Sequence, residues 1–370
     1  MPRPIHICLF CSTTGIGGTE RMALAFLSRC DKAKFKPHFL TLLDDGGEAL
    51  REAERLGVPR YGLNWRGRFN LGAFRRFKQY LRENQIDLIH NFGLRAELLS
   101  RPVSKRCGVK RMVSGIRDTD PWRRWYHVLA DRATAGAVDL FIANSEGARQ
   151  VSMRREKIPA EKIITIHNGI DLPRGSYDVD EMRQRHGIAP ERSPVIVQVA
   201  NLVPQKKGHD LLFEAVKRLL PDYPRLLAIC VGHDKSNGAI PALAKEKGVE
   251  GAVHFTGYAP NVFEWLSLAD VAVLPSRFES MPVSILEAMS MRLPVVASDA
   301  GGIPEVIQDG VNGRIIPTGQ ADPLYAALKE LLNDPEQRTR LAQSARQSIE
   351  NDFTLEAMTR RLEEVYLSLM

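Results

Sequence analysis

The sequence lacks several features that would place the protein in a membrane or an oxidising compartment. No apolar run approaches the roughly 18–20 residues that span a bilayer. The apolar start at residues 5–11 is short and runs directly into a glycine-rich segment, which favours a buried strand over a signal peptide. The five cysteines are odd in number, and Cys8 and Cys11 have no second pair to complete a zinc site. We therefore expect a cytoplasmic protein with buried, reduced thiols.

Charge is distributed unevenly along the chain. The net charge of +7 combines +13 in residues 1–175 with −6 in residues 176–370, and residues 60–124 alone carry +11. Such a local excess indicates an anionic partner or surface. No recognisable RNA-binding or DNA-binding motif accompanies it, so we expect no nucleic-acid partner.

The length of 370 residues and the alternation of apolar runs with amphipathic stretches predict two α/β domains. The expected strands are 5–11, 38–43, 86–90, 111–116, 138–143 and 162–166 in the first half, and 195–200, 226–231, 253–256, 271–274, 294–298 and 313–316 in the second. The expected helices are 20–30, 48–56, 71–83, 94–105, 122–134 and 146–154, then 210–220, 239–247, 262–268, 283–291, 321–332, 336–350 and 355–369.

A polar stretch with proline and glycine, roughly 171–194, separates the two halves. We expect domains at 1–172 and 193–350, each a doubly wound, Rossmann-like parallel sheet. Open sheets of this kind bind ligands at the carboxyl ends of their strands. A crevice between the two domains is the expected ligand site.

A glycine-rich turn follows the first predicted strand and includes Gly17 and Gly18. Backbone N–H groups in such a turn can approach a phosphate. A dinucleotide fingerprint would place a third glycine where Glu20 stands, which weakens a dehydrogenase interpretation. A tight strand–helix turn without a ligand remains an alternative.

Two segments of the second half carry candidate binding groups. Lys207 precedes a glycine after the first strand of that half, where it could meet a diphosphate, although a single lysine is a weak signal. Glu279 and Glu287 flank Pro282, which suits the first turn of a helix. A carboxylate at Glu287 can accept hydrogen bonds from a ribose diol, and Glu279 can meet sugar hydroxyls. A helix-dipole partner plus a surface glutamate is the alternative.

The order and spacing of these motifs resemble the retaining glycosyltransferases of family 4, which have the GT-B fold. The resemblance runs from end to end of the chain. It rests on the Gly-Gly-Thr-Glu loop, His90, Asn144-Ser145, Asn168-Gly169-Ile170-Asp171, Lys207-Gly208, the two-glutamate segment, Ala300-Gly301-Gly302-Ile303-Pro304-Glu305, Asp309-Gly310 and Gly313.

The resemblance implies roles for individual residues. Lys207 would contact the donor diphosphate, Glu279 the donor sugar and Glu287 the ribose, with Lys207, Glu279 and His90 as catalytic residues. The remaining donor-binding positions would be Gly17, Gly18, Asn201, Gly232, Tyr258 (at the base), Ser280, Met281, Pro282 and Val283. The last helix, 354–370, would pack back onto the first domain.

Two departures from the family pattern affect the site. Asn201 stands where the family often has arginine, which removes a positive charge from the diphosphate site. Arg117 stands where similar enzymes often have histidine. Arginine does not accept a proton at ordinary pH, so we expect Arg117 to contact the acceptor or a phosphate.

The implied reaction moves a sugar from a nucleoside diphosphate sugar to a hydroxyl acceptor with anomeric retention. By analogy the acceptor would be a lipid-linked, polysaccharide or lipopolysaccharide intermediate. No cofactor is expected, and no metal, because no paired carboxylates accompany the residues assigned to the diphosphate. A GT-B phosphorylase or epimerase, or a non-catalytic sugar-nucleotide-binding protein, remains an alternative.

The basic stretch at 60–124 predicts peripheral association with the inner face of the cytoplasmic membrane, because basic groups and aromatic rings favour an anionic bilayer surface. Its members are Arg66, Arg68, Arg75, Arg76, Lys78, Arg82, Lys105, Arg106, Lys110, Arg111, Arg123 and Arg124, with Trp65, Phe69, Phe74, Trp122, Trp125 and Tyr126. Alternatively, Leu71, Phe74, Phe77 and Leu81 recur at helical spacing and would form a buried face with ordinary solvated arginines beside it.

Overall fold

The computed structural model describes residues 3–370 except 66, 68–69, 118–122 and 174. The chain divides into two compact units. Unit 1 comprises residues 1–169 and 355–370, and unit 2 comprises residues 170–354. The segment 173–192, expected as a linker, is part of unit 2, and the final helix is part of unit 1.

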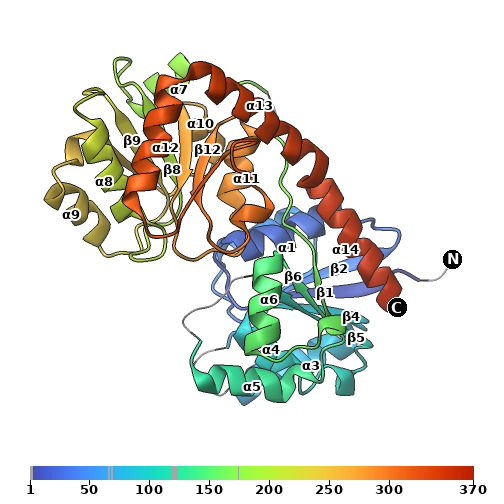
Figure 1. The fold of residues 1–370 in the computed structure, drawn as a ribbon. Coiled ribbons are helices and arrows are strands. Elements are labelled where there is room, and N and C mark those ends of the chain that lie inside the picture. Colours follow the sequence, from blue (N-terminus) through green and yellow to red (C-terminus); the bar gives the residue numbers. More distant parts are fainter. Residues whose placement is uncertain (1–2, 66, 68–69, 118–122, 174) are drawn as a thin grey trace. The chain divides into compact units, whose positions relative to one another are not determined.

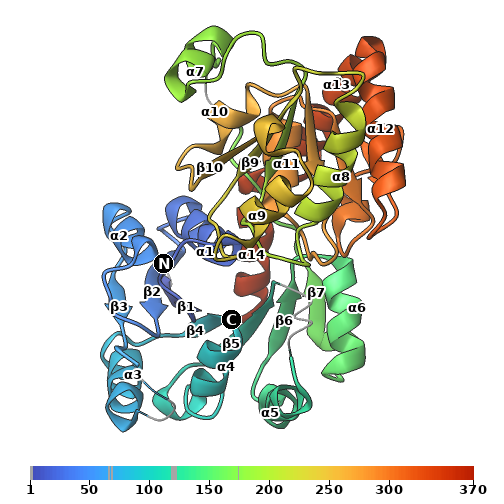
Figure 2. The ribbon, with the colours of Figure 1, turned by 90° about the vertical axis from the view of Figure 1, so that its left-hand side faces the viewer.

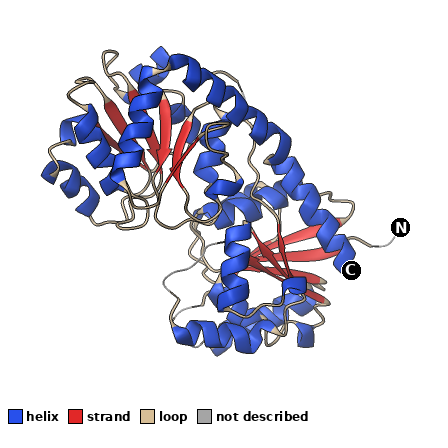
Figure 3. Cartoon of the chain, in the orientation of Figure 1, coloured by secondary structure: helices blue, strands red, loops and turns tan. Residues whose placement is uncertain are grey.

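Unit 1 is a parallel sheet covered by helices, as Figure 3 shows in red and blue. Its strands are β1 (Ile5–Cys11), β2 (Phe35–Thr41), β3 (Arg60–Gly62), β4 (Leu88–Phe92), β5 (Arg111–Ile116), β6 (Leu140–Ala143) and β7 (Ile163–Thr165). Its helices are α1 (Gly18–Arg29), α2 (Glu48–Arg55), α3 (Leu71–Glu83), α4 (Leu94–Ser100), α5 (Trp125–Ala135), α6 (Glu146–Arg155) and α14 (Leu355–Leu369), with short 3-10 turns at Lys105–Cys107 and Ala160–Lys162. The strand order, β3-β2-β1-β4-β5-β6-β7, reverses between β1 and β4.

Apolar side chains pack both faces of this sheet. Residues of α3, α4 and α6 share one core cluster with the sheet. On α3 the buried face is formed by Phe77 and Leu81 together with Ala73 and Tyr80, whereas Leu71, expected there, is 79% exposed. Helix α14 contacts α1, and its buried Tyr366 meets the edge of Phe26 with ring centroids 5.3 Å apart. These contacts fasten the end of the chain to unit 1.

Unit 2 repeats the plan with the strand order β10-β9-β8-β11-β12-β13 in a parallel sheet (Figure 1). Its strands are β8 (Val195–Val199), β9 (Leu227–Val231), β10 (Val253–Gly257), β11 (Val271–Leu274), β12 (Val295–Ser298) and β13 (Arg314–Ile316). Its helices are α7 (Val179–His186), α8 (His209–Leu219), α9 (Ala239–Glu246), α10 (Val262–Leu266), α11 (Val283–Ser290), α12 (Ala321–Asn333) and α13 (Pro335–Asp352), with 3-10 turns at Glu250–Ala252 and Ile303–Glu305.

Two apolar clusters form the core of unit 2. Helices α8, α9 and α12 pack on one face of the sheet, and Figure 2 shows α8 beside α12. Helices α10, α11 and α13 pack on the other face. The carboxyl ends of β8 and β11, where the strand order reverses, are therefore the place where this sheet can bind a ligand.

Helix α7 was not predicted and lies in the segment expected as a linker. The carboxylate of Asp178 accepts a hydrogen bond from the Glu181 N–H at 2.8 Å, which caps the helix start. Gly187 ends it with a φ of +66°. Met182 and Ile188 are buried in the core of unit 2, so burial of two apolar side chains offsets the polar composition of the segment.

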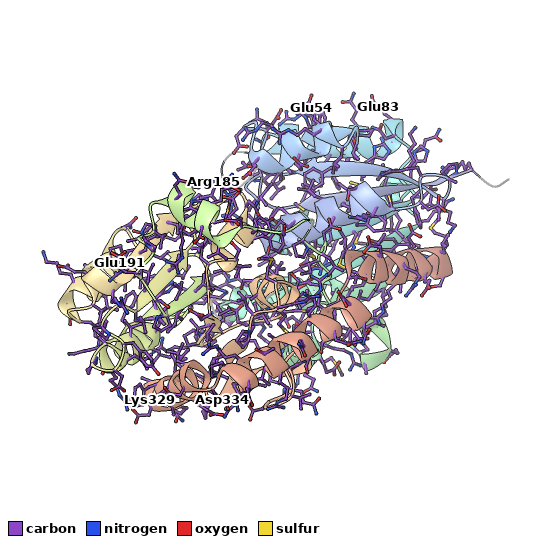
Figure 4. The ribbon with its side chains drawn as sticks, turned by 90° about the horizontal axis from the view of Figure 1, so that it is seen from above. Glu54, Glu83, Arg185, Glu191, Lys329 and Asp334 are labelled. Atoms are coloured by element: carbon purple, nitrogen blue, oxygen red, sulfur yellow. The ribbon has the colours of Figure 1, made fainter. Side chains whose placement is uncertain are left out.

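Figure 4 labels six charged side chains, and all of them except the half-buried Lys329 are exposed. Within the described part of the chain, none of the helices has the length and apolar character needed to cross a bilayer. All five cysteines are buried free thiols. Burial raises the pKa of Cys8, Cys11 and Cys230.

Candidate active site

A lysine and a glutamate meet in unit 2 at the point where the strand order reverses. Lys207 lies in the loop that follows β8, and Glu279 lies in the loop that follows β11. The Lys207 Nζ is 2.5 Å from the Glu279 Oε1. The side chain of Lys207 is 18% exposed and that of Glu279 is 7% exposed. The structure thus pairs two residues, 72 positions apart, that the sequence had assigned to one site.

Hydrogen bonds and an ion pair fix the two loops to each other. The buried Gln198 amide donates to the Lys207 carbonyl at 2.7 Å, and the Arg277 N–H donates to the Lys206 carbonyl at 2.7 Å. Arg277 also grips the carboxylate of Asp210, at the start of α8, through two bonds of 2.8 and 2.6 Å. These bonds lower the pKa of Asp210. Bidentate pairs of this kind set orientation as well as charge, so Lys207 and Glu279 are held by a rigid frame.

Close backbone approach at two glycines tightens this frame. Gly208 has a φ of +68°, and a Cβ there would lie 2.0 Å from the Pro275 carbonyl oxygen. Gly301 has a φ of +59°, and its Cβ would lie 1.9 Å from the Glu279 carbonyl oxygen. Neither position has room for a side chain, and both have a left-handed backbone that glycine adopts most readily. The loops after β8, β11 and β12 therefore close on one another.

Helix α11 begins beside Glu279. Pro282 is its N-cap rather than a residue of the first turn, and no side chain among the described residues caps it. Its first N–H groups, beginning at Val283, therefore have no partner within the helix and form a positive helix end. Ser280 and Met281, immediately before it, are buried. Glu287 is only 7% exposed, on the second turn of α11.

The loops after β9 and β10 contribute a pair of stacked rings. Tyr258 follows β10 and is 38% exposed. Its ring lies 4.7 Å from that of the exposed His233, with only 9° between the planes. The side-chain oxygen of Asn201 accepts a hydrogen bond from the backbone N–H of His233 at 3.1 Å. Gly232 directly precedes His233. Sequence reasoning missed His233, whose only signal was an aromatic ring just after a buried strand.

The predicted residues of unit 1 lie at the carboxyl ends of β1 and β5. Gly17 and Gly18 begin α1 and are exposed, and the Gly17 N–H donates to the Glu20 carboxylate at 3.1 Å. Arg117 directly follows β5 and is partly buried. It donates to the Asn168 side-chain oxygen at 2.9 Å, and its guanidinium lies 5.3 Å from the centre of the Phe92 ring.

His90, expected as a catalytic residue, lies inside β4 and is 0% exposed. Its Nδ1 is 2.6 Å from the Tyr366 hydroxyl of α14, and its Nε2 is buried with no partner among the described residues. Burial lowers the pKa of His90 well below its usual range, so the ring is neutral. An imidazole enclosed in this way does not touch a substrate. The structure favours a role for His90 in holding α14.

No group of three or more metal-ligating side chains occurs among the described residues. The chain does contain two Asp-x-Asp sequences, Asp118-Thr119-Asp120 and Asp178-Val179-Asp180. The first lies outside the described residues. In the second, Asp178 caps α7. Metal independence therefore stays a prediction.

Comparison with known proteins places both halves of the chain. Residues 16–174 match the family described as Glycosyltransferase Family 4, and residues 178–348 match Glycosyl transferases group 1. The chain belongs to glycosyltransferase family 4. The sequence had led to the same family.

Curated relatives of this family 4 protein include the alpha-D-kanosaminyltransferase of Streptomyces kanamyceticus, 29% identical over 68% of this chain and 64% of that protein. Another is the lipopolysaccharide core biosynthesis glycosyltransferase LpsE of Rhizobium meliloti, 32% identical over 49% of this chain and 51% of that protein. The matched region thus spans between about half and two thirds of the length of these two relatives.

Solved structures with the same fold confirm the GT-B class. Anabaena Alr3699/HepE in complex with UDP and glucose superposes with a TM-score of 0.87 at 21% identity, covering 98% of this chain and all of that one. WaaG, a glycosyltransferase involved in lipopolysaccharide biosynthesis, superposes with a TM-score of 0.75 at 19% identity, covering 98% of this chain and 99% of that one.

Proposed function

We propose that this protein transfers a sugar from a nucleoside diphosphate sugar to a hydroxyl acceptor, with retention of the anomeric configuration. The observation that carries the proposal is the contact of 2.5 Å between Lys207 and Glu279 beside the uncapped start of α11. Family membership supports the same reaction, and HepE, of the same fold, has been crystallised with UDP-glucose.

In this proposal Lys207 binds the diphosphate of the donor and Glu279 binds its sugar. An ammonium has three donors, so Lys207 can keep its bond to Glu279 and still meet a diphosphate. The second carboxylate oxygen of Glu279 accepts bonds from sugar hydroxyls. As the bond from sugar to diphosphate breaks, negative charge grows on the leaving group, and Lys207 and the N-terminus of α11 stabilise it. These groups are fixed in advance, so little reorganisation accompanies the reaction.

The nucleoside occupies the neighbouring loops in this proposal. Glu287 accepts the ribose hydroxyls, and the exposed Tyr258 contacts the base. Asn201, whose side chain already binds the His233 N–H at 3.1 Å, supports that loop rather than adding charge to the diphosphate site. Charge on the leaving group is then met by Lys207 without a metal ion.

A membrane-facing surface on α5 fits a lipid-linked or lipopolysaccharide acceptor. Trp125, Tyr126 and Leu129 are 77%, 44% and 57% exposed, and Arg124 and Arg132 flank them. Aromatic rings beside basic groups favour an anionic bilayer surface. Figure 2 shows α5 at the edge of unit 1. We place the peripheral contact here, on the cytoplasmic side.

The structure does not favour the whole basic stretch at 60–124 as the membrane-facing surface. Arg76 donates to the Leu63 carbonyl at 2.6 Å, Lys110 pairs with Asp87, and Arg123 pairs with two buried carboxylates. Arg66, Arg68, Phe69 and Trp122 lie outside the described residues. Much of the positive charge at 60–124 is thus used within unit 1.

A stability screen followed by product analysis tests the proposed reaction. A nucleoside diphosphate at 100 times its dissociation constant should add about 2.7 kcal/mol to the free energy of unfolding. NMR of the product formed from the matching sugar donor should show the same anomeric configuration as the donor. Stabilisation by no nucleotide, or use of inorganic phosphate as the co-substrate, would contradict the proposal.

A further inference from the structure

A cavity of about 260 Å³ lies within unit 1. It opens between the loops that follow β1, β4 and β5 and the helices α4, α5 and α6. Liquid water occupies about 30 Å³ per molecule, so the cavity has room for a ligand group of several heavy atoms. Eight of the eighteen described residues that line it carry a charged side chain, which is a high share for a partly enclosed space.

Three arginines and three carboxylates form a continuous chain along the wall. Arg101 pairs with Glu97 at 3.1 Å and also with Asp131. Arg123 pairs with Asp131 at 2.6 Å and with Glu156 at 3.2 Å. Arg155 closes the chain on Glu156 at 2.5 Å. The six charges balance, so this part of the wall carries no net charge.

Arg117 is the remaining cation of the lining, and it has no carboxylate partner among the described residues. Its Nη1 donates to the Asn168 side chain at 2.9 Å, whereas its Nε is buried without a hydrogen-bond partner in that part of the chain. Removal from water lowers the pKa of Arg117 to about 10, which leaves the guanidinium charged at neutral pH. A half-buried charge of this kind is costly unless it is paired, so the Arg117 guanidinium is suited to an anionic ligand in the cavity.

Glu20 supplies a second kind of group to the same lining. Its carboxylate is 8% exposed and accepts bonds from the Thr13 hydroxyl at 2.5 Å and the Gly17 N–H at 3.1 Å. Both donors are neutral, and each carboxylate oxygen can accept a further bond. Glu20 and Arg117 both line the cavity. A hydroxyl acceptor and an oxyanion binder thus line the same space.

We propose that this cavity binds the acceptor, and that the acceptor is a polyhydroxylated compound carrying an oxyanion, a phosphate or a carboxylate. The oxyanion pairs with the Arg117 guanidinium, and hydroxyls bond to the Glu20 carboxylate, both of which belong to residues of the cavity lining. The role as an acceptor site rests on the proposed function, whereas binding itself does not.

Calorimetry with small probes tests the site directly. The probes are sn-glycerol 3-phosphate and glycerate, with glycerol as the uncharged control, at low ionic strength because salt screens such contacts. Wild-type protein should bind at least one charged probe and not glycerol. Arg117→Gln should weaken binding at least about thirtyfold, the equivalent of ~2 kcal/mol for a buried charge that loses its partner. Arg117→Lys, which keeps the charge, should lose less.

Two further variants locate the binding. Lys207→Ala in unit 2 should leave the affinity for the charged probes unchanged, and so should Arg75→Gln on the exposed surface of α3. An unchanged affinity in Arg117→Gln, or its loss in Lys207→Ala, would overturn the proposal, as would failure of both charged probes to bind wild-type protein. Nucleoside diphosphate binding by Arg117→Gln shows that the variant is folded. If the wild-type protein bound no nucleoside diphosphate, that result would instead count against the proposed reaction.

A soluble short-chain phosphatidylglycerol distinguishes the sources of the oxyanion. Tighter binding of this lipid than of sn-glycerol 3-phosphate would assign the site to a lipid headgroup, and weaker binding would assign it to a free acceptor. Either result supports the site only if Arg117→Gln also weakens this binding at least about thirtyfold. Lipid binding that ignores the Arg117 substitution would contradict it.

Discussion

Units 1 and 2 share the order of their first six strands, to which unit 1 adds β7, and they differ in how the groups at the ends of their strands are held. In unit 2 the loops around Lys207 touch through backbone, with no room for a Cβ at Gly208 or Gly301, and the buried face of α8 is apolar except for His209. In unit 1, Asp131 is the buried residue of α5 among those described, and it joins α5 to the unit by ion pairs. Apolar residues of α5 face outward instead.

The two ways of holding these groups suit two kinds of ligand, one of constant geometry and one of variable structure. Glycine contacts and buried apolar helices hold the backbone in fixed positions, which suits a diphosphate whose geometry is the same in every donor. Ion pairs around a cavity leave space and exchangeable polar groups, which suits an acceptor that differs from one enzyme to another. This contrast agrees with our proposal, in which unit 2 binds the donor and unit 1 binds the acceptor.

Breaking the ion chain should have the largest effect. Asp131→Ala leaves Arg101 and Arg123 buried without one partner, and loss of a buried pair costs about 3–5 kcal/mol. Urea unfolding followed by tryptophan fluorescence should show this loss, because Trp65 and Trp125 belong to unit 1. The control is Asp322→Ala, which removes the 89% exposed partner of Arg218 in unit 2. Equal stability of the two variants would remove the contrast between the units.

Substitution of Lys207 in unit 2 should lower turnover without impairing folding. Lys207→Ala should lower kcat by roughly 10²–10³, the usual scale for one preorganised stabiliser of a developing charge. Steady-state kinetics with the matching donor measures this fall. Lys206→Ala, one residue away, is the matched control and should do far less. Similar losses in both variants would show that the wrong lysine, or the wrong site, has been assigned.

The outward face of α5 should account for a smaller, salt-dependent effect. Trp125→Ser with Leu129→Ser should reduce sedimentation with anionic vesicles, and binding to neutral vesicles should be absent throughout. Leu71→Ser, at a 79% exposed leucine of α3, is the control and should sediment like wild type. Binding should weaken as salt rises. Wild-type protein that fails to sediment with anionic vesicles at low salt would end the membrane hypothesis.

The smallest expected effect is that of a chelator. Lys207 and the start of α11 meet the diphosphate charge in our proposal, so activity should persist in excess EDTA. Complete loss that magnesium restores would contradict the donor site as drawn. The carboxylates of Asp118 and Asp120 would then be the first to substitute.

Periodicity and motifs predicted most of the framework. Alternating apolar and amphipathic segments gave two parallel sheets, and the spacing of Lys207, Glu279 and Glu287 identified the loops of unit 2. Helix α7 was missed because its composition is polar. Its apolar anchoring comes from two buried residues, Met182 within the helix and Ile188 just after it. The three residues of β3, Arg60–Gly62, form no apolar run, so no strand was expected there and that edge strand was missed as well.

Other features depend on contacts that a single sequence does not encode locally. The ion chain joins Glu97 of α4, Asp131 of α5 and Glu156, the C-cap of α6, and the cavity is lined where these segments meet. His90 follows a strongly apolar run and resembled a site residue, yet the pleat turns it into the core toward Tyr366. The outward orientation of Trp125 is likewise set by tertiary packing rather than by the sequence of α5.

Calorimetry with the nucleoside diphosphate that most stabilises the wild-type protein is the most direct test of which glutamate binds the nucleotide and which binds the sugar. Glu287→Ala should weaken binding of the diphosphate itself by tenfold or more, since a hydrogen bond to a charged group contributes about 1.5–3 kcal/mol. Glu279→Ala should leave diphosphate affinity nearly intact and weaken only the intact sugar donor, and Arg117→Gln in unit 1 should change neither. The reverse order of the two glutamates, or loss of diphosphate binding in Arg117→Gln, would contradict the assignment of the donor to unit 2.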